Sequence, residues 1–249
     1  MFLAAVVQMT STSDSETNWA QARGLVERAA SYGAKFIATP ENTNYLGPPA
    51  EKVRTAESLD GPTCRRFAEL AGRLGIHLLL GSFNERSDEP ARCHNTSVLF
   101  GPDGQALAAY RKIHLFDVDV SEAVRCRESE CVAPGERPVV VATPLGRLGL
   151  SICYDLRFGN LYRRLVRDGA EVLCVPAAFT LTTGRDHWEP LLRARAIEAQ
   201  SYVLAPGGLL VVVHPTRSNL QRHARPGPRH LLEDGELPGL VRGMEVLRY

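Results

Sequence analysis

Short apolar runs alternate with amphipathic segments along the first 205 residues of this 249-residue chain. Leu3–Val7 is expected to form a strand, and the next segment has apolar residues at helical spacing up to about Tyr32. Gly33 follows that segment, as glycine often does at the end of a helix. Repeated strand–helix–strand units predict an α/β layered fold, because each helix can cover one face of a sheet.

The later elements continue this alternation. Strands are expected at Lys35–Thr39, Ile76–Gly81, Thr96–Phe100, Gln105–Tyr110, Val139–Ala142, Leu148–Cys153, Glu171–Pro176 and Tyr202–Ala205. Helices are expected from about Pro62 to Leu74, from Gly159 to Val166 and from Trp188 to Gln200. Gly101–Gly104, which separates two of the strands, has the composition of a hairpin turn.

The composition argues against several classes of partner. Twenty-nine basic and 28 acidic residues leave a net charge of +1, so no nucleic acid is expected to bind. No apolar run approaches the roughly 20 residues that cross a bilayer, so no membrane association is expected. The first residues have no basic start and soon become polar, which is unlike a signal peptide. We therefore expect a soluble, cytoplasmic protein.

The six cysteines show no regular framework. They form no CxxC pair, so neither a zinc site nor a disulfide scaffold is expected. Cys126 and Cys131 are separated by four residues, which leaves a weak metal or redox pair as an alternative. We expect no metal and no cofactor.

One cysteine stands between an apolar run and a polar segment. The run leads through Leu148–Leu150 to Cys153, and a helix-like segment, Asp155 to Asp168, follows. A thiol at such an elbow would be exposed near the positive end of a helix, where its pKa falls. The alternative is a buried cysteine that packs as a small apolar residue.

Chemically reactive residues follow three of the expected strands. Glu41, Lys112 and Cys153 lie in segments that end strands, and such ends meet at one edge of a layered α/β fold. A thiol nucleophile needs a base, which Glu41 could supply, and a positive charge for the oxyanion, which Lys112 could supply. The backbone N–H of Tyr154 could be a second oxyanion donor. Taken singly, Glu41 and Lys112 also fit a solvated loop carboxylate and a surface basic residue.

Several longer motifs occur in a fixed order. They are Ala5–Met9, Pro40–Asn42, Gly81–Phe83, Tyr110–Asp117, Gly149–Phe158, Pro176–Thr180, Thr183–Trp188 and Arg193–Glu198. Together they resemble the carbon–nitrogen hydrolase (nitrilase) superfamily over about residues 2 to 205. The resemblance is greatest to its deaminated glutathione amidase and omega-amidase branch.

This resemblance implies a four-layer α-β-β-α sandwich and a Glu-Lys-Cys triad. Carried onto this chain, Glu41 accepts a proton, Lys112 stabilises the intermediate and Cys153 is the nucleophile. Glu128, matched through the segment Cys126–Ser129, would position the substrate or the lysine. The tripeptide Cys153–Asp155 is of the amidase type, which implies hydrolysis of a small carboxylated amide through a thioester, with release of ammonia.

The resemblance also suggests residues that bind the substrate. Tyr154, Phe179, Thr180 and Thr183 are expected to line the pocket, although core packing is an equal alternative for Phe179. His187 is expected to make a structural contact and not to bind a metal. A homodimer is implied as well.

The last part of the chain departs from the family pattern. We expect residues 1–205 to form the hydrolase domain and residues 206–249 to form an atypical tail. Eleven of those 44 residues are Gly or Pro, which suggests one possible strand at Leu209–Val213 and poor order after it. The alternative function is therefore a catalytically silent binding protein with the same fold.

Overall fold

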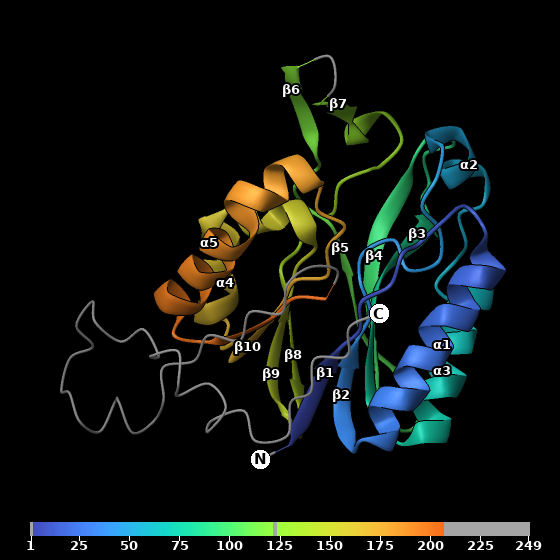
Figure 1. The fold of residues 1–249 in the computed structure, drawn as a ribbon, viewed down its shortest axis with the longest axis vertical. Helices are drawn as coiled ribbons and strands as arrows, with labels where there is room; N and C mark the ends of the chain where they lie inside the picture. Colours follow the sequence, from blue (N-terminus) through green and yellow to red (C-terminus); the bar gives the residue numbers. More distant parts are fainter. Residues whose placement is uncertain (1, 122–123, 207–249) are drawn as a thin grey trace.

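A computed structural model describes residues 2–121 and 124–206 of the chain. Figure 1 shows two β-sheets that face each other, with a pair of helices on the outer side of each sheet. The expected four-layer α-β-β-α sandwich is therefore confirmed. The expected tail, 206–249, lies outside the described residues except for Pro206.

The first sheet has five strands in chain order. The three strands β1 to β3 are parallel, and β3, β4 and β5 pair antiparallel to one another. Its strands are β1 (Leu3–Val6), β2 (Ala34–Ala38), β3 (His77–Arg86), β4 (Cys93–Phe100) and β5 (Ala106–Arg111). The outer face is covered by α1 (Ser15–Ser31) and α3 (Pro62–Leu74), and the short α2 (Pro49–Arg54) lies beyond the end of β2.

The second sheet has the strand order β11-β10-β9-β8. Its strands are β8 (Val139–Thr143), β9 (Gly146–Leu150), β10 (Val172–Cys174) and β11 (Tyr202–Leu204). Its outer face is covered by α4 (Gly159–Arg167) and α5 (Leu181–Ala199). A separate two-stranded ribbon, β6 (Asp117–Ser121) with β7 (Val124–Arg127), extends beyond the sheet edges and leads into a 3₁₀ turn, Glu128–Glu130.

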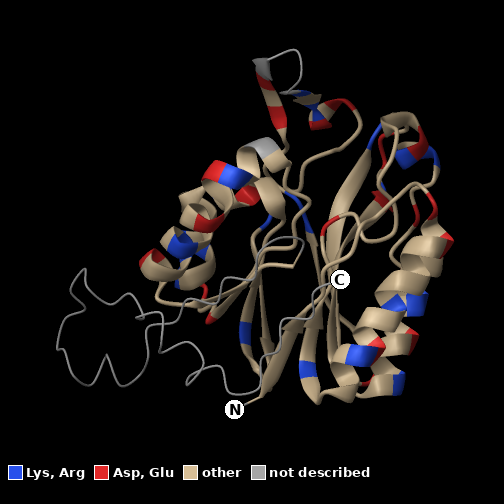
Figure 2. Ribbon diagram, viewed as in Figure 1, with Lys and Arg blue, Asp and Glu red and all other residues tan. Residues whose placement is uncertain are grey.

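Apolar residues of both sheets form a shared inner layer. Leu79 and Leu99 of the first sheet belong to one buried cluster with Leu148 and Leu173 of the second. Burial of this size is the main force that holds two sheets face to face. Figure 2 shows acidic and basic residues interspersed along the outer helices. Within the described ranges, no helix is long and apolar enough to span a bilayer.

Several element boundaries differ from the sequence-based expectation. The strand β9 ends at Leu150, so Cys153 lies in a separate 3₁₀ turn, Cys153–Arg157, and not at the end of a strand. The helix expected from Trp188 begins at Leu181, where the Thr180 carbonyl accepts from the Gly184 N–H at 2.7 Å, and Pro190 is accommodated inside it. The helix α2 and the ribbon β6–β7 were not expected, since their sequences have little apolar periodicity.

One glycine fixes the approach of β3 to the turn after β2. A Cβ at Gly81 would overlap the backbone oxygens of Thr39 and Pro40, so no larger residue fits there without a shift of the Pro40–Glu41 backbone. Gly24, in the middle of α1, has no atom near the place of a Cβ. A side chain at position 81 therefore requires a backbone shift, whereas a side chain at position 24 does not.

We predict that Gly81→Ala lowers the free energy of unfolding by roughly 3 kcal/mol or more, because overpacking against backbone is not relieved by rotamer changes. Gly24→Ala should be neutral or stabilise by up to about 1 kcal/mol, since alanine favours a helix. Urea unfolding followed by circular dichroism measures both changes. Equal stabilities for the two variants would contradict the close approach at Gly81.

Candidate active site

Four acidic, basic and thiol side chains meet where strands of both sheets end. Glu41 lies in the turn after β2, and Lys112 directly follows β5. Glu128 opens the 3₁₀ turn after β7, and Cys153 opens the 3₁₀ turn after β9. The structure thus brings together all four residues that the sequence singled out as catalytic.

The ammonium group of Lys112 lies between two carboxylates. Its Nζ donates to Glu41 Oε1 at 2.9 Å and to both carboxylate oxygens of Glu128, at 3.1 and 2.9 Å. The side chain is only 2% exposed. Burial opposes the positive charge, but the charges of Glu41 and Glu128 outweigh burial and raise the pKa of Lys112 well above its ordinary value. Lys112 is therefore a fixed cation.

Donors from three parts of the chain surround the Glu41 carboxylate. Oε1 accepts from Lys112 and from the Asn95 side-chain amide, each at 2.9 Å. Oε2 accepts from the backbone N–H of Ala178 at 2.8 Å, in the segment after β10. The charge of Glu41 also acts on the nearby Cys153 thiol and raises its pKa. A proton on that sulfur therefore has a carboxylate within reach.

Glu128 is held on its other side by the chain that follows Lys112. Its Oε2 accepts from the backbone N–H of Phe116 at 2.7 Å. Burial opposes ionisation, but the charges of Lys112 and of Lys52 in α2 lower the pKa of Glu128 below its ordinary value. Glu128 is therefore a carboxylate that secures the lysine.

The environment of Cys153 differs from the sequence-based expectation. The residue is only 8% exposed and has a φ of 48°, with its N–H donating to Pro176 O at 2.8 Å. Burial raises the pKa of the thiol well above its ordinary value, the charge of Glu41 raises it further, and Lys112 only partly opposes them. The expected fall in pKa is wrong, because the adjoining 3₁₀ turn of five residues is too short to outweigh desolvation. The thiol is held protonated and needs a base.

A buried aspartate anchors the turn that carries Cys153. Asp155 accepts from the Ile152 N–H at 2.9 Å, from the Tyr110 hydroxyl at 2.7 Å and from the His114 N–H at 3.0 Å. These bonds tie the turn to β5 and to the segment after Lys112. Sequence reasoning gave Asp155 no structural role, although an acid inside an otherwise apolar segment was a signal.

An aromatic and cationic group includes two residues of the 3₁₀ turn Cys153–Arg157. The Arg157 guanidinium lies 5.7 Å from the Tyr154 ring centroid and 5.5 Å from that of Phe179. Its Nη2 is 3.2 Å from His187 Nδ1, so His187 contacts this arginine. Phe179 also packs against Trp188, with ring centroids 4.8 Å apart. Sequence reasoning did not single out Arg157, because nothing local distinguishes it from other arginines.

The expected pocket residues occupy two places. Tyr154 and Phe179 share contacts with Arg157, as described above. Thr180 and Thr183 lie at the start of α5, where their hydroxyl oxygens are 2.7 Å apart. The two threonines therefore bond to each other beside the half-buried Phe179.

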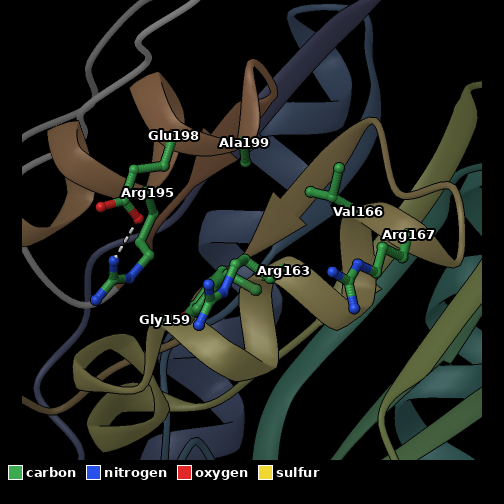
Figure 3. Close-up of a pocket in the computed structure, with 8 residues that line it drawn as sticks. Gly159, Arg163, Val166, Arg167, Arg195, Glu198 and Ala199 are labelled. Atoms are coloured by element: carbon green, nitrogen blue, oxygen red, sulfur yellow. Dashed lines mark hydrogen bonds and ion pairs between the residues drawn. The ribbon is translucent and has the colours of Figure 1, made fainter.

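A separate cavity of about 210 Å³ lies between α4 and α5. Figure 3 shows its lining, including an ion pair of Arg195 with Glu198. None of the four catalytic candidates lines it, so it is not the site described above. In the part of the chain that the structure describes, no cluster of three or more His, Cys, Asp or Glu residues is arranged to hold a metal.

Comparison with protein families and sequences gives consistent matches. The family model described as carbon–nitrogen hydrolase matches residues 3–224. A deaminated glutathione amidase of Synechocystis sp. is 42% identical over 246 residues, which cover 96% of this chain and 90% of that protein. A deaminated glutathione amidase of Rattus norvegicus is 42% identical over 210 residues, covering 82% of this chain and 64% of that protein.

Solved structures share the same fold. The NitFhit protein of C. elegans superposes with a TM-score of 0.77 at 41% identity, covering 82% of this chain and 50% of that chain. This chain thus spans half of that longer protein. A mutant amidase of Nesterenkonia sp. AN1, with acrylamide added to its active-site cysteine, gives a TM-score of 0.69 at 25% identity and covers 83% of this chain and 81% of that chain.

Thiol reactivity tests the environment of Cys153. Burial and Glu41 hold its pKa high, so its alkylation by iodoacetamide should accelerate from about pH 6 to about pH 9 as thiolate forms. Mass spectrometry of the alkylated peptides gives the rate. A rate already at its maximum near pH 6 would show a lowered pKa.

The other thiols provide internal controls for that experiment. Cys126 is exposed and should also be labelled in the native protein, whereas Cys126→Ser removes only that adduct. Burial raises the pKa of Cys64 and of Cys174 to about 12, so both should react only after unfolding.

Proposed function

The chain belongs to the carbon–nitrogen hydrolase family, and from this we propose which amides it cleaves and which residues carry out the steps. It is a cysteine-dependent amidase that hydrolyses a non-peptide carbon–nitrogen bond. The relatives favour this activity over that of a catalytically silent binding protein. The observation that carries the proposal is Lys112, buried between Glu41 and Glu128, with the Cys153 thiol near enough to Glu41 for its charge to raise the pKa of the thiol.

In the first half-reaction, the Cys153 sulfur attacks the amide carbonyl carbon and its proton passes to Glu41. The negative charge that develops on the carbonyl oxygen is stabilised by Lys112 and by the Tyr154 backbone N–H. Glu41 then returns the proton to the nitrogen, the carbon–nitrogen bond breaks and ammonia leaves. The acyl group remains on Cys153 as a thioester.

In the second half-reaction, Glu41 takes a proton from a water molecule that attacks the thioester carbonyl. The same donors stabilise the second tetrahedral intermediate. Its collapse breaks the carbon–sulfur bond, releases a carboxylic acid and returns the proton to the Cys153 sulfur. Glu41 thus serves as base and acid in turn, while Lys112 keeps its charge throughout.

The substrate that we propose is a small amide that carries a carboxylate. Two relatives are named deaminated glutathione amidase, and deaminated glutathione is a small amide that carries carboxylates. Arg157, stacked over Tyr154 and Phe179, is a cation at the end of the turn that begins at Cys153, and it can pair with a carboxylate. Phe179, Thr180 and Thr183 would line the same side of the pocket.

The same proposal covers the cellular location and the oligomeric state of the protein. We propose a cytoplasmic location. All six cysteines are free, which supports this location, because disulfides are rare in the cytoplasm. We also propose a homodimer. Leu181, at the start of α5, is 88% exposed, and a second copy would cover it. Light scattering on the purified chain measures the mass.

The hydrolase domain would span residues 1–205, with residues 206–249 as the atypical tail.

Release of ammonia from the omega-amide of a deaminated glutamine tests the activity. The purified chain should release ammonia at a rate that depends on enzyme concentration, and Cys153→Ala should abolish it because no thioester can form. Cys126→Ser, at an exposed thiol away from the four site residues, is the matched control. Equal release by wild type and Cys153→Ala would disprove the mechanism.

Glu41→Gln should lower kcat by about 10²- to 10⁴-fold with little change in KM, because the amide keeps the shape but accepts no proton. Steady-state kinetics on the same substrate measure both constants. If KM rises while kcat falls by less than about tenfold, Glu41 binds substrate instead of moving protons.

Arg157→Leu should raise KM for a carboxylated amide by roughly tenfold or more, because the ion pair between the half-buried Arg157 and the substrate carboxylate is lost. A neutral aliphatic amide of the same length serves as the comparison substrate and should be affected by less than about threefold. Equal effects on both substrates would remove Arg157 from carboxylate recognition.

A further inference from the structure

One buried amide side chain touches both carboxylates of the site. Asn95, on β4, is 1% exposed. Its Nδ2 donates to Glu41 Oε1 at 2.9 Å and lies 3.4 Å from Glu128 Oε1. Its backbone oxygen accepts from the N–H of Lys112 at 2.9 Å. Asn95 therefore contacts all three charged residues of the site.

The orientation of this amide follows from the charges around it. Two carboxylate oxygens face the side chain, so the NH₂ group must point toward them, because the amide oxygen would be repelled. The Oδ1 atom then points away and has no hydrogen-bond partner among the described residues. An unpaired buried acceptor costs stability. The amide therefore has its role in the bonds that its NH₂ group makes to the two carboxylates.

We propose that Asn95 is a positioning residue that holds Glu41 and Glu128 in place on either side of Lys112. The proposal rests on the catalytic roles proposed above for these residues. Lys112 alone binds two carboxylates that repel each other, and Asn95 adds a second, uncharged donor between the same two oxygens. It does so without adding charge to the buried group.

The two donors on Glu41 also decide which oxygen faces the thiol. Oε1 is occupied by Lys112 and Asn95, so Oε2, which accepts from Ala178 N–H, is the oxygen left to take a proton from Cys153. Loss of Asn95 should therefore leave the Glu41 carboxylate less firmly oriented toward the Cys153 sulfur.

A neighbouring asparagine offers a matched control. Asn84, on β3, pairs directly with Asn95 across the two strands and is completely buried. Both polar atoms of its amide lack a partner among the described residues. Replacing Asn84 with Leu thus tests the same change of size and polarity at the same depth, without removing a bond to a carboxylate.

The experiment compares Asn95→Leu, Asn95→Ser and Asn84→Leu with wild type. Asn95→Leu should lower kcat by about 10- to 100-fold and change KM by less than about threefold, because the base is misplaced while substrate binding is kept. Asn95→Ser, which is smaller and too short to reach both carboxylates, should act in the same direction and covers a failure of the Leu variant to fold. Asn84→Leu should leave kcat and KM unchanged.

A second readout does not depend on the choice of substrate. Because the nearby charge of Glu41 raises the pKa of Cys153, a displaced Glu41 should move the pH profile of Cys153 alkylation to lower pH in Asn95→Leu, and Asn84→Leu should not. If wild type releases no ammonia but the alkylation profile shifts as stated, the proposed function fails and the role of Asn95 stands. Unchanged profiles in both Asn95 variants, or the same shift in Asn84→Leu, would overturn the role.

Discussion

The site depends on one ammonium group that is buried between two carboxylates. Lys112 carries one positive charge, while Glu41 and Glu128 together carry two negative charges. A buried ion pair is stable only when the remaining lone pairs find donors. Here, neutral donors complete the set: the Asn95 amide and the backbone N–H groups of Phe116 and Ala178. Any change that moves one of these donors disturbs the balance of charge around the lysine.

These donors come from both sheets, so the site exists only when the sheets are packed. Asn95 lies on β4 of the first sheet, Lys112 directly follows β5, and Ala178 follows a strand of the second sheet. Asp155 reinforces the junction, because its carboxylate accepts from Tyr110 of β5 while holding the turn of Cys153. The apolar layer between the sheets and the polar site at their edge therefore support each other.

The same packing explains the chemistry of the thiol. An isolated turn with a cysteine at its start suggests an exposed thiolate, and the residues next to Cys153 in the sequence do not indicate that the thiol is buried. In the fold, desolvation and the charge of Glu41 dominate, and both raise the pKa of Cys153. A protonated thiol close to a carboxylate suits a mechanism in which the proton moves only as the sulfur attacks.

Much of the fold could be predicted because its signals are local. Apolar runs, helical spacing and glycines after helices identified most strands and helices, and the expected layers are present. The ribbon β6–β7 could not be predicted, because its strands are short and polar and are held by pairing with each other. The early start of α5 was missed since Pro190 obscures a helix whose cap lies at Thr180.

The sequence by itself determined the layered architecture and the chemical types available at the strand ends: a thiol, an amine and carboxylates. Only the tertiary structure decided how they interact, because pKa values and hydrogen bonds depend on burial and on partners distant in the chain. Asn95 and Glu41 are 54 residues apart, and Glu41 and Ala178 are 137 apart. No local pattern encodes such pairs, and they form only when the two sheets bring their ends together.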